Sequence, residues 1–281
     1  MRADRPGAAT RAKVWTLDGE TEVRRRDSVV TEEPLEIRLS AGGRTQTVAV
    51  TMRTPGHDFE LATGFLHAEG LLPGVPHQVS YCADVEQADQ KFNVVTVETD
   101  VPALEAPVRS GIVSSACGVC GSASLDALHE RGLRRVADHV TVPVDVLYGL
   151  PDALRSAQGV FEVTGGLHAA GLFTADGSLV ATREDVGRHN AVDKLVGWGV
   201  LGARLPLSGT VLMVSGRCGY EIVQKAVAAG IPVVASVSAP SSLAVAVAED
   251  FGVTLVGFLR GGRCNVYAGR ERLRLPVPAA T

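Results

Sequence analysis

Apolar and polar residues alternate early in the chain, a pattern typical of β-strands with one buried face. Residues 35–39 and 45–52 alternate on either side of Ala41-Gly42-Gly43-Arg44, and this arrangement predicts a β-hairpin. The period then changes to that of a helix, which we expect from about residue 58 to residue 69, with Gly70 at its end. Its apolar positions are Phe59, Ala62, Phe65 and Leu66.

Two shorter stretches, residues 79–85 and 91–98, predict further strands. A short helix is expected over residues 125–130. Residues 31–137 are therefore expected to form a mixed α+β domain. Residues 1–30 are polar and irregular in pattern, so we expect them to form a flexible, loosely held tail.

In the second part of the chain, residues 138–281, strands alternate with helices. Two strands around Asp176-Gly177 predict a hairpin, and Asp185 is expected to cap a helix through residues 190–196. The β-branched runs that follow predict parallel strands in a sheet with helices on both faces. The expected elements are strand 210–215, helix 220–229, strand 231–237, helix 241–250 and strand 253–258. The predicted fold class is therefore α/β with an α+β N-terminal part.

Ligands of parallel sheets bind beyond the carboxyl ends of the strands, and three predicted loops gather there. The loops are residues 215–219, 238–242 and 258–263; all contain Gly or Ser, and two contain Arg. Glycine lets backbone N–H groups approach an anion, arginine offers paired donors, and helix N-termini add a favourable dipole. This combination favours a phosphate-bearing ligand such as a nucleotide, although no loop has a P-loop or dinucleotide-binding fingerprint. The alternative interpretation is that these three loops are ordinary turns that bind no ligand.

Further polar residues border the predicted pocket. His168 follows two glycines, Arg188 and His189 lie where a helix begins, and Ser215 and Arg217 belong to the first loop. A lone histidine is more often packed or capping than functional. Here two histidines accompany arginines at one predicted edge, and we expect ligand contacts among these five residues.

Composition and charge narrow the possible functions. A net charge of −4 over 281 residues argues against a general nucleic-acid binder. No apolar run reaches the roughly 18 residues of a membrane helix, and no apolar signal-peptide core follows the basic N-terminal residues. We expect a soluble, cytoplasmic protein without a nucleic-acid or membrane partner. Five cysteines, an odd number, fit a reducing compartment better than a disulfide framework.

A run of small residues contains Cys117 and Cys120 in a Cys-x-x-Cys pair. Small neighbours keep a loop mobile and its thiols accessible, and we expect a mobile loop over residues 111–124. A structural zinc site needs four ligands, usually from two such pairs, and the sequence has one Cys-x-x-Cys pair with Cys82, Cys218 and Cys264 scattered elsewhere. His67 and Glu69 would complete a deaminase-like pattern, but an alanine precedes the first cysteine where that pattern has proline, and the histidine falls in a last helical turn. We expect no structural zinc.

Two other uses of the cysteine pair stay open. A thioredoxin-like dithiol opens a helix directly after a strand, whereas this pair lies between two regions and lacks a flanking Trp or Pro. A regulatory disulfide is still compatible with the pattern. In sulfur transfer, a thiolate accepts sulfane sulfur as a persulfide, and a second cysteine helps release it by forming a disulfide. The N-terminus of the following helix would lower a thiol pKa, most directly that of Cys120.

Several segments together resemble the FdhD family, the formate dehydrogenase accessory sulfurtransferases. They run in family order from about residue 30 to residue 270 and are far more specific than a bare Cys-x-x-Cys pair. The matching segments are residues 53–58 (RTPGHD), 64–66 (GFL), 69–70 (EG), 114–121 (SSACGVCG), 164–168 (TGGLH), 183–194 (REDVGRHNAVDK) and 214–217 (VSGR).

The resemblance implies that sulfur passes from a cysteine desulfurase to the molybdenum cofactor, bis(molybdopterin guanine dinucleotide), before that cofactor enters the formate dehydrogenase apoprotein. By the same resemblance, Cys117 carries the persulfide, Cys120 assists, and the chain forms a homodimer. The C-terminal domain is expected to be similar in fold to cytidine deaminases, with a mixed sheet and helices on both faces. Contact with the guanine dinucleotide, for which GDP would be a mimic, is implied for Phe258, Leu259, Arg260, Gly261, Gly262 and Arg263. The alternative function is a cofactor-binding chaperone whose cysteines only bind or sense redox state.

Overall fold

The structure is a computed structural model that describes residues 5–82, 92–100, 125–137 and 139–275. Its smaller sheet has the strand order β4-β3-β6-β5, with β3 parallel to β6 and the outer pairs antiparallel. The predicted first hairpin and first helix are confirmed. These elements are β3 (Glu33–Ala41), β4 (Arg44–Arg53), α1 (Asp58–Ala68), β5 (Gln78–Tyr81) and β6 (Val94–Thr99).

The larger sheet has six strands in the order β13-β12-β11-β10-β8-β9. Its central strands β10, β11 and β12 are parallel, as predicted, while β8, β9 and β13 run antiparallel to their neighbours, so the sheet is mixed. The strands are β8 (His168–Thr174), β9 (Leu179–Asp185), β10 (Thr210–Val214), β11 (Val233–Ser236), β12 (Thr254–Arg260) and β13 (Arg263–Ala268). The helices between them are α5 (Arg188–Leu201), α6 (Tyr220–Ala228) and α7 (Ser242–Phe251).

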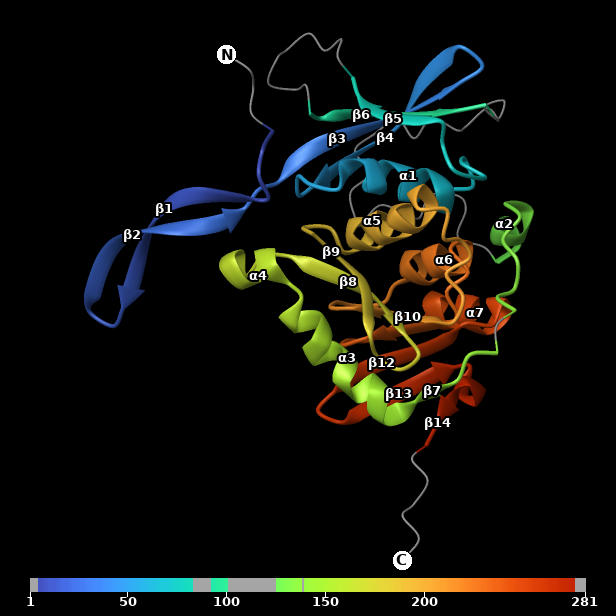
Figure 1. Cartoon of the computed structure of the whole chain (residues 1–281). Coiled ribbons are helices and arrows are strands. Elements are labelled where there is room, and N and C mark those ends of the chain that lie inside the picture. Colours follow the sequence, from blue (N-terminus) through green and yellow to red (C-terminus); the bar gives the residue numbers. More distant parts are fainter. Residues whose placement is uncertain (1–4, 83–91, 101–124, 138, 276–281) are drawn as a thin grey trace, which may run out of the picture.

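The larger sheet has helices on both of its faces (Figure 1). Successive side chains of each strand point to opposite faces, so each strand contributes to two apolar layers. Leu212 and Val214 face the core between the two sheets, which also contains α1, α5, α6 and α7. Val211 and Met213 face the opposite side, where α3 (Val144–Ser156) packs. The first core contains side chains from both predicted domains, so the two parts of the chain share one apolar interior.

The remaining described elements are short. They are α2 (Leu125–Glu130), β7 (Val142–Pro143), α4 (Gly159–Thr164), a 3-10 turn at Arg270–Arg272, and β14 (Leu273–Arg274), which pairs with β7. Within the described ranges, none of the helices combines the length and apolarity needed to cross a bilayer.

Residues 9–30, within the segment expected to be a flexible, loosely held tail, form a regular hairpin of two ten-residue strands, β1 (Ala9–Asp18) and β2 (Thr21–Val30). The hairpin extends away from the layered body (Figure 1). Its side chains are mostly exposed, including Trp15 at 60% and Leu17 at 72%. Because neither face packs on a core, the alternation that identifies a half-buried strand is absent from this segment.

Helices α1 and α5 cross at two glycines. A Cβ atom on Gly64 would lie 1.9 Å from the carbonyl oxygen of Asp193, and one on Gly197 would lie 1.8 Å from that of Glu60. Any side chain at either position would overlap the backbone of the opposite helix. The glycines therefore allow the segment at residues 53–58 and the segment at residues 183–194 to meet.

Candidate functional site

The three loops predicted to gather at the carboxyl ends of the parallel strands do meet. The first and second loops are joined by hydrogen bonds from Cys218 N–H to Ala239 O at 3.2 Å and from Ser241 N–H to Cys218 O at 3.1 Å. The third joins the second through Phe258 N–H, which donates to Ser238 O at 3.2 Å. One continuous rim therefore runs along this edge of the sheet.

A cationic cluster lies at one side of this rim, formed by Arg188, His189, His168 and Arg217. Burial and the neighbouring Arg217 lower the pKa of Arg188, and burial and Arg188 lower the pKa of His168. Burial, with Arg188 as the next cause, lowers the pKa of His189 to about 3. Both imidazoles are therefore neutral near pH 7, while the guanidinium groups stay charged. The 3.2 Å contact between His189 Nδ1 and Glu221 Oε2 is consequently not an ion pair at that pH.

Two buried polar atoms of the cluster, Arg188 Nε and His189 Nδ1, have no partner in hydrogen-bond geometry among the described residues, although Glu221 Oε2 lies 3.2 Å from His189 Nδ1. His189 has a side-chain exposure of only 9%, so water has little access to it. Buried polar groups are normally hydrogen-bonded, and an exception indicates a bound partner or a functional role. Arg188 is the first residue of α5, so its guanidinium lies beside a helix N-terminus. This arrangement is suited to binding an anion such as phosphate.

The turn between β12 and β13 is a tight hairpin rather than a loop that encircles a phosphate. Gly261 and Gly262 have φ values of 58° and 70°, as the two central residues of a type I′ turn require. Arg260 and Arg263 are direct cross-strand partners and both are exposed. Like charges at opposing positions are unfavourable unless an anion lies between them.

The described residues around this turn line a cavity of about 420 Å³, to which Phe258, Arg260, Gly261, Arg263 and Asn265 contribute. Leu259 does not contribute, because its side chain is fully buried in the core against α3. If Leu259 contacts the ligand as expected, the contact is made by its backbone and not by its side chain.

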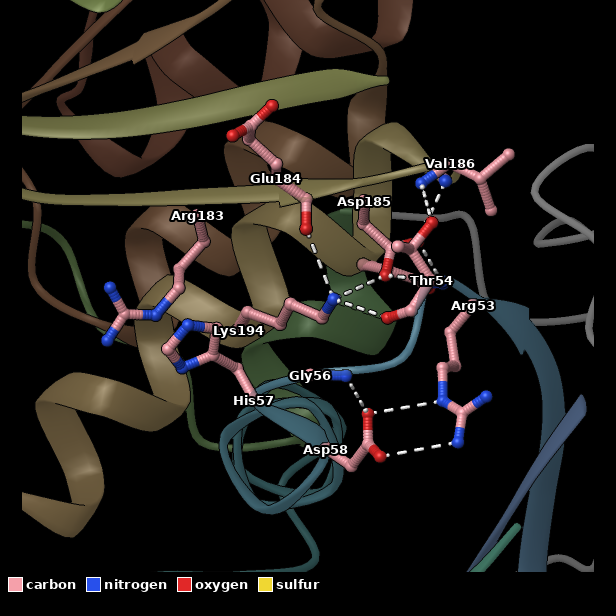
Figure 2. A network of polar contacts seen from close by, with 12 residues as sticks. Arg53, Thr54, Gly56, His57, Asp58, Arg183, Glu184, Asp185, Val186 and Lys194 are labelled. Carbon is pink, nitrogen blue, oxygen red and sulfur yellow. Dashed lines mark hydrogen bonds and ion pairs between the residues drawn. The ribbon is translucent and has the colours of Figure 1, made fainter. Parts of the chain in front are cut away.

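Lys194 anchors the cluster to the rest of the fold (Figure 2). Its ammonium group is 1% exposed and lies 2.7 Å from Asp185 Oδ2. It also donates to Thr54 O at 2.9 Å and to Glu184 O at 3.1 Å, so all three of its N–H donors have acceptors. Lys194 is thus bound to β9 and to the segment that precedes α1, which positions the first turns of α5.

Asp185 is the last residue of β9, not the helix cap that the sequence predicts, and Gly187 occupies the N-cap position of α5. The carboxylate nevertheless organises the start of the helix. It accepts hydrogen bonds from Gly187 N–H at 2.8 Å and from Asn190 Nδ2 at 3.0 Å. Because it also accepts from Thr54 N–H at 3.1 Å, it joins the two halves of the chain.

Arg53 and Asp58 form the second part of this buried network (Figure 2). Arg53 Nε and Nη2 lie 3.1 and 3.3 Å from the two carboxylate oxygens of Asp58. Asp58 also accepts from Gly56 N–H at 3.1 Å and from the hydroxyl of Tyr81 at 2.8 Å. The pair holds the turn before α1, and with it Thr54, in position.

The cysteine pair lies outside the described residues. The last described residue before Cys117 and Cys120 is Asp100, at the end of β6, and the next is Leu125, at the start of α2. His67, considered above as a zinc ligand, has both ring nitrogens near backbone carbonyls: Nδ1 is 3.0 Å from Leu72 O and Nε2 is 3.1 Å from Ala228 O. The fold therefore already uses both nitrogens.

Sequence reasoning did not identify several polar residues near the rim. Glu221, in the first turn of α6, contacts His189. Gln158 and Arg155 line a cavity next to His168. No motif marks these residues, and the only available signal was their proximity in sequence to segments that already bordered the predicted pocket.

Comparisons with known proteins give a consistent result. Residues 30–274 match the FdhD/NarQ family. The chain is 51% identical to a sulfur carrier protein FdhD of Nocardia farcinica over 94% of each chain. It is 54% identical to a sulfur carrier protein FdhD of Streptomyces coelicolor, over 89% of this chain and 90% of that one.

The fold is also similar to a solved structure. A crystal structure from Desulfotalea psychrophila, assigned as a formate dehydrogenase accessory protein, has a TM-score of 0.73. That comparison covers 95% of this chain and 100% of the other at 23% identity, so it supports the fold.

Proposed function

The chain belongs to the FdhD/NarQ family, and from this premise we propose that it is a sulfur carrier that supplies sulfur for formate dehydrogenase. In this proposal it acts as a sulfurtransferase. The sulfur donor is a cysteine desulfurase, and the acceptor is a molybdenum cofactor of the bis(molybdopterin guanine dinucleotide) type. The formate dehydrogenase apoprotein receives that cofactor afterwards. The proposed carrier works as a homodimer in the cytoplasm.

Loading of the sulfur is a thiol exchange. The Cys117 thiolate attacks the terminal sulfur of the desulfurase persulfide, the sulfur–sulfur bond of the donor breaks, and its electron pair leaves with the desulfurase thiolate. A Cys117 persulfide forms without an external oxidant or reductant. The exchange requires only an accessible thiolate.

Release of the sulfur is the proposed role of Cys120. Its thiolate attacks the Cys117 sulfur of the persulfide, a Cys117–Cys120 disulfide forms, and hydrosulfide leaves toward the acceptor. A thiol reductant then restores the pair by supplying two electrons and two protons.

The observation that carries the acceptor side of the proposal is the cationic cluster of Arg188, His189, His168 and Arg217, in which the buried Arg188 Nε has no hydrogen-bond partner among the described residues. Within the same part of the chain, His189 Nδ1 has none in hydrogen-bond geometry, although Glu221 Oε2 lies 3.2 Å away. At the third loop of the same rim, the exposed Arg260 and Arg263 are direct cross-strand partners. A guanine dinucleotide carries a diphosphate, whose oxygens would accept from such donors. These residues therefore fit the proposed acceptor, with the phosphates at the arginines.

Sulfur loading is tested by incubating the protein with a cysteine desulfurase and free cysteine and then measuring its intact mass. The proposal expects a gain of one or more sulfur atoms that a reductant removes. A protein that binds GDP but never gains sulfur would instead be the alternative, a chaperone with a redox-sensing cysteine pair.

We expect Arg188→Gln and Arg217→Gln each to weaken GDP binding about tenfold or more, since a charged hydrogen bond contributes about 1.5–3 kcal/mol. Isothermal titration calorimetry measures the affinity. The control is Arg204→Gln, because Arg204 stacks on Trp198 just beyond the far end of α5, about 20 Å away by the rise of the helix. Equal affinities in all three variants would exclude the cluster as a phosphate site.

The double variant Arg260→Ala/Arg263→Ala is expected to weaken GDP binding about tenfold, because it removes two exposed guanidinium groups and leaves the turn glycines in place. The hairpin between β3 and β4 provides the matched control. Its turn has the same two positive-φ glycines, Gly42 and Gly43, followed by Arg44. Calorimetry should find that Arg44→Ala binds GDP like the unaltered protein; unchanged affinity in the double variant would remove the β12–β13 turn from the site.

A further inference from the structure

A second cavity lies on the α3 side of His168. Its volume is about 490 Å³, within the range of pockets that hold small ligands. Apolar side chains such as Leu154 and Val237 form much of its wall, and no Asp or Glu is among the described residues that line it. His168 and Ser215 also line it, so it adjoins the cationic cluster.

Gln158 gives this cavity an unused hydrogen-bond donor. The residue is 4% exposed, and its Nε2 has no partner among the described residues. Although Gln158 is the N-cap residue of α4, its side chain makes no capping hydrogen bond. A buried amide of this kind is satisfied only when something that enters the cavity presents an acceptor.

The same cavity has a flat, cationic wall. The guanidinium of Arg155 lies 4.1 Å from the centroid of the Phe161 ring, and both residues line the cavity. Glu184 fixes the aromatic partner, because its carboxylate accepts from Val160 N–H at 3.0 Å and from Phe161 N–H at 2.8 Å. Planar groups of this type stack on heterocyclic rings.

We propose that this cavity binds the 2-amino-4-oxopyrimidine ring that guanine and pterins share, with Gln158 Nε2 donating to the ring carbonyl and the ring lying against Arg155 and Phe161. The assignment rests on the proposed function, which supplies a ligand that contains both ring types. His168 both lines the cavity and neighbours Arg188 and Arg217 within the cationic cluster, so a ligand with its ring in the cavity has its phosphates directed toward those arginines. The ring carbonyl selects for guanine over adenine, which presents an amino group at that position.

The test measures binding of GDP, ADP, pyrophosphate and pterin to the full chain and to three variants. Gln158→Leu removes the donor and keeps the volume, Arg155→Ala removes an exposed side chain with little effect on folding, and Val163→Ala is the matched control on an α4 residue that is 61% exposed. We expect Gln158→Leu and Arg155→Ala each to weaken GDP binding about tenfold, to leave pyrophosphate binding unchanged and to reduce the preference for GDP over ADP. Val163→Ala should match the unaltered protein.

The outcomes separate this assignment from the proposed function. Unchanged affinity for both GDP and pterin in the two cavity variants overturns the assignment of the cavity and leaves the carrier proposal intact. Equal weakening of pyrophosphate and GDP binding has the same consequence. If the unaltered protein binds none of the four probes, the acceptor side of the proposed function fails first. Pterin binding that depends on Gln158 while GDP binding does not would assign the cavity to the pterin end of the ligand.

Discussion

Cys117→Ala is expected to abolish sulfur loading by a cysteine desulfurase, with intact mass spectrometry showing no sulfur adduct where the unaltered protein shows one. The expectation follows from the proposed exchange, in which the Cys117 thiolate is the only nucleophile that takes the sulfur. Cys120→Ala should still load and should release its sulfur more slowly, because no neighbouring thiolate displaces it.

The other cysteines of the described part of the chain offer little competing reactivity. Burial raises the pKa of the Cys218 thiol to about 12, and it also raises that of Cys264. Cys82 is half-buried, with its sulfur 3.7 Å from Arg38 Nη1, and Cys82→Ser therefore serves as the control, which should load normally. An adduct that persists in Cys117→Ala, or that disappears in Cys82→Ser, would contradict the assignment of Cys117 as the carrier.

The Cys117→Ala/Cys120→Ala double variant should bind GDP with unaltered affinity. The residues argued to hold the ligand come from other segments of the chain. Calorimetry on the double variant therefore distinguishes loss of sulfur chemistry from loss of folding.

Gly197→Ala is expected to lower the free energy of unfolding by about 3 kcal/mol or more, as measured by urea denaturation. A Cβ at this position would lie 1.8 Å from Glu60 O and 2.6 Å from the carbon of the same carbonyl, and backbone cannot rotate away as a side chain can. The two helices must separate. Separation strains the contacts of Lys194 with Thr54 O and Asp185, which lie close to the crossing.

Gly149→Ala is the matched control, because Gly149 is exposed within α3 and an added Cβ meets nothing within 4 Å. Alanine is the better helix former, so this variant should be as stable as the unaltered protein or more stable by up to about 1 kcal/mol. Similar unfolding free energies for the two variants would show that α1 and α5 do not cross as closely as the structure has them.

Local patterns predicted most elements to within a few residues. The hairpin of β3 and β4 and helix α1 each bury one face, and that burial imposes a period that can be read from neighbours in the chain. The strands β10 to β12 are buried on both faces and were recognised instead as continuous apolar, β-branched runs. The β1–β2 hairpin was missed because it buries neither face. The hairpin of β8 and β9 was predicted, and the family resemblance implied a mixed sheet, but the pairing of β8 with β10 was not predicted, because it depends on where a strand distant in the chain comes to lie.

The gathering of three Gly- and Ser-containing loops could be predicted, because parallel strands end at the same edge of a sheet whatever their side chains. The role of the turn at Arg260–Arg263 could not be predicted in the same way. Gly-Gly is equally compatible with a phosphate-binding loop and a type I′ hairpin, and only the pairing of β12 with β13 decides between them.

The sequence by itself determined the family, the Cys-x-x-Cys pair and the order of most strands and helices, because motifs, spacing and periodicity are properties of neighbouring residues. Only the tertiary structure decided the electrostatic state of the candidate site. Burial makes His189 neutral and leaves Arg188 Nε without a hydrogen-bond partner among the described residues. The buried Lys194 depends on partners such as Thr54, which is 140 residues away in the chain. The free energy of a charge or a polar group is set by what surrounds it in space, and no local pattern contains that information.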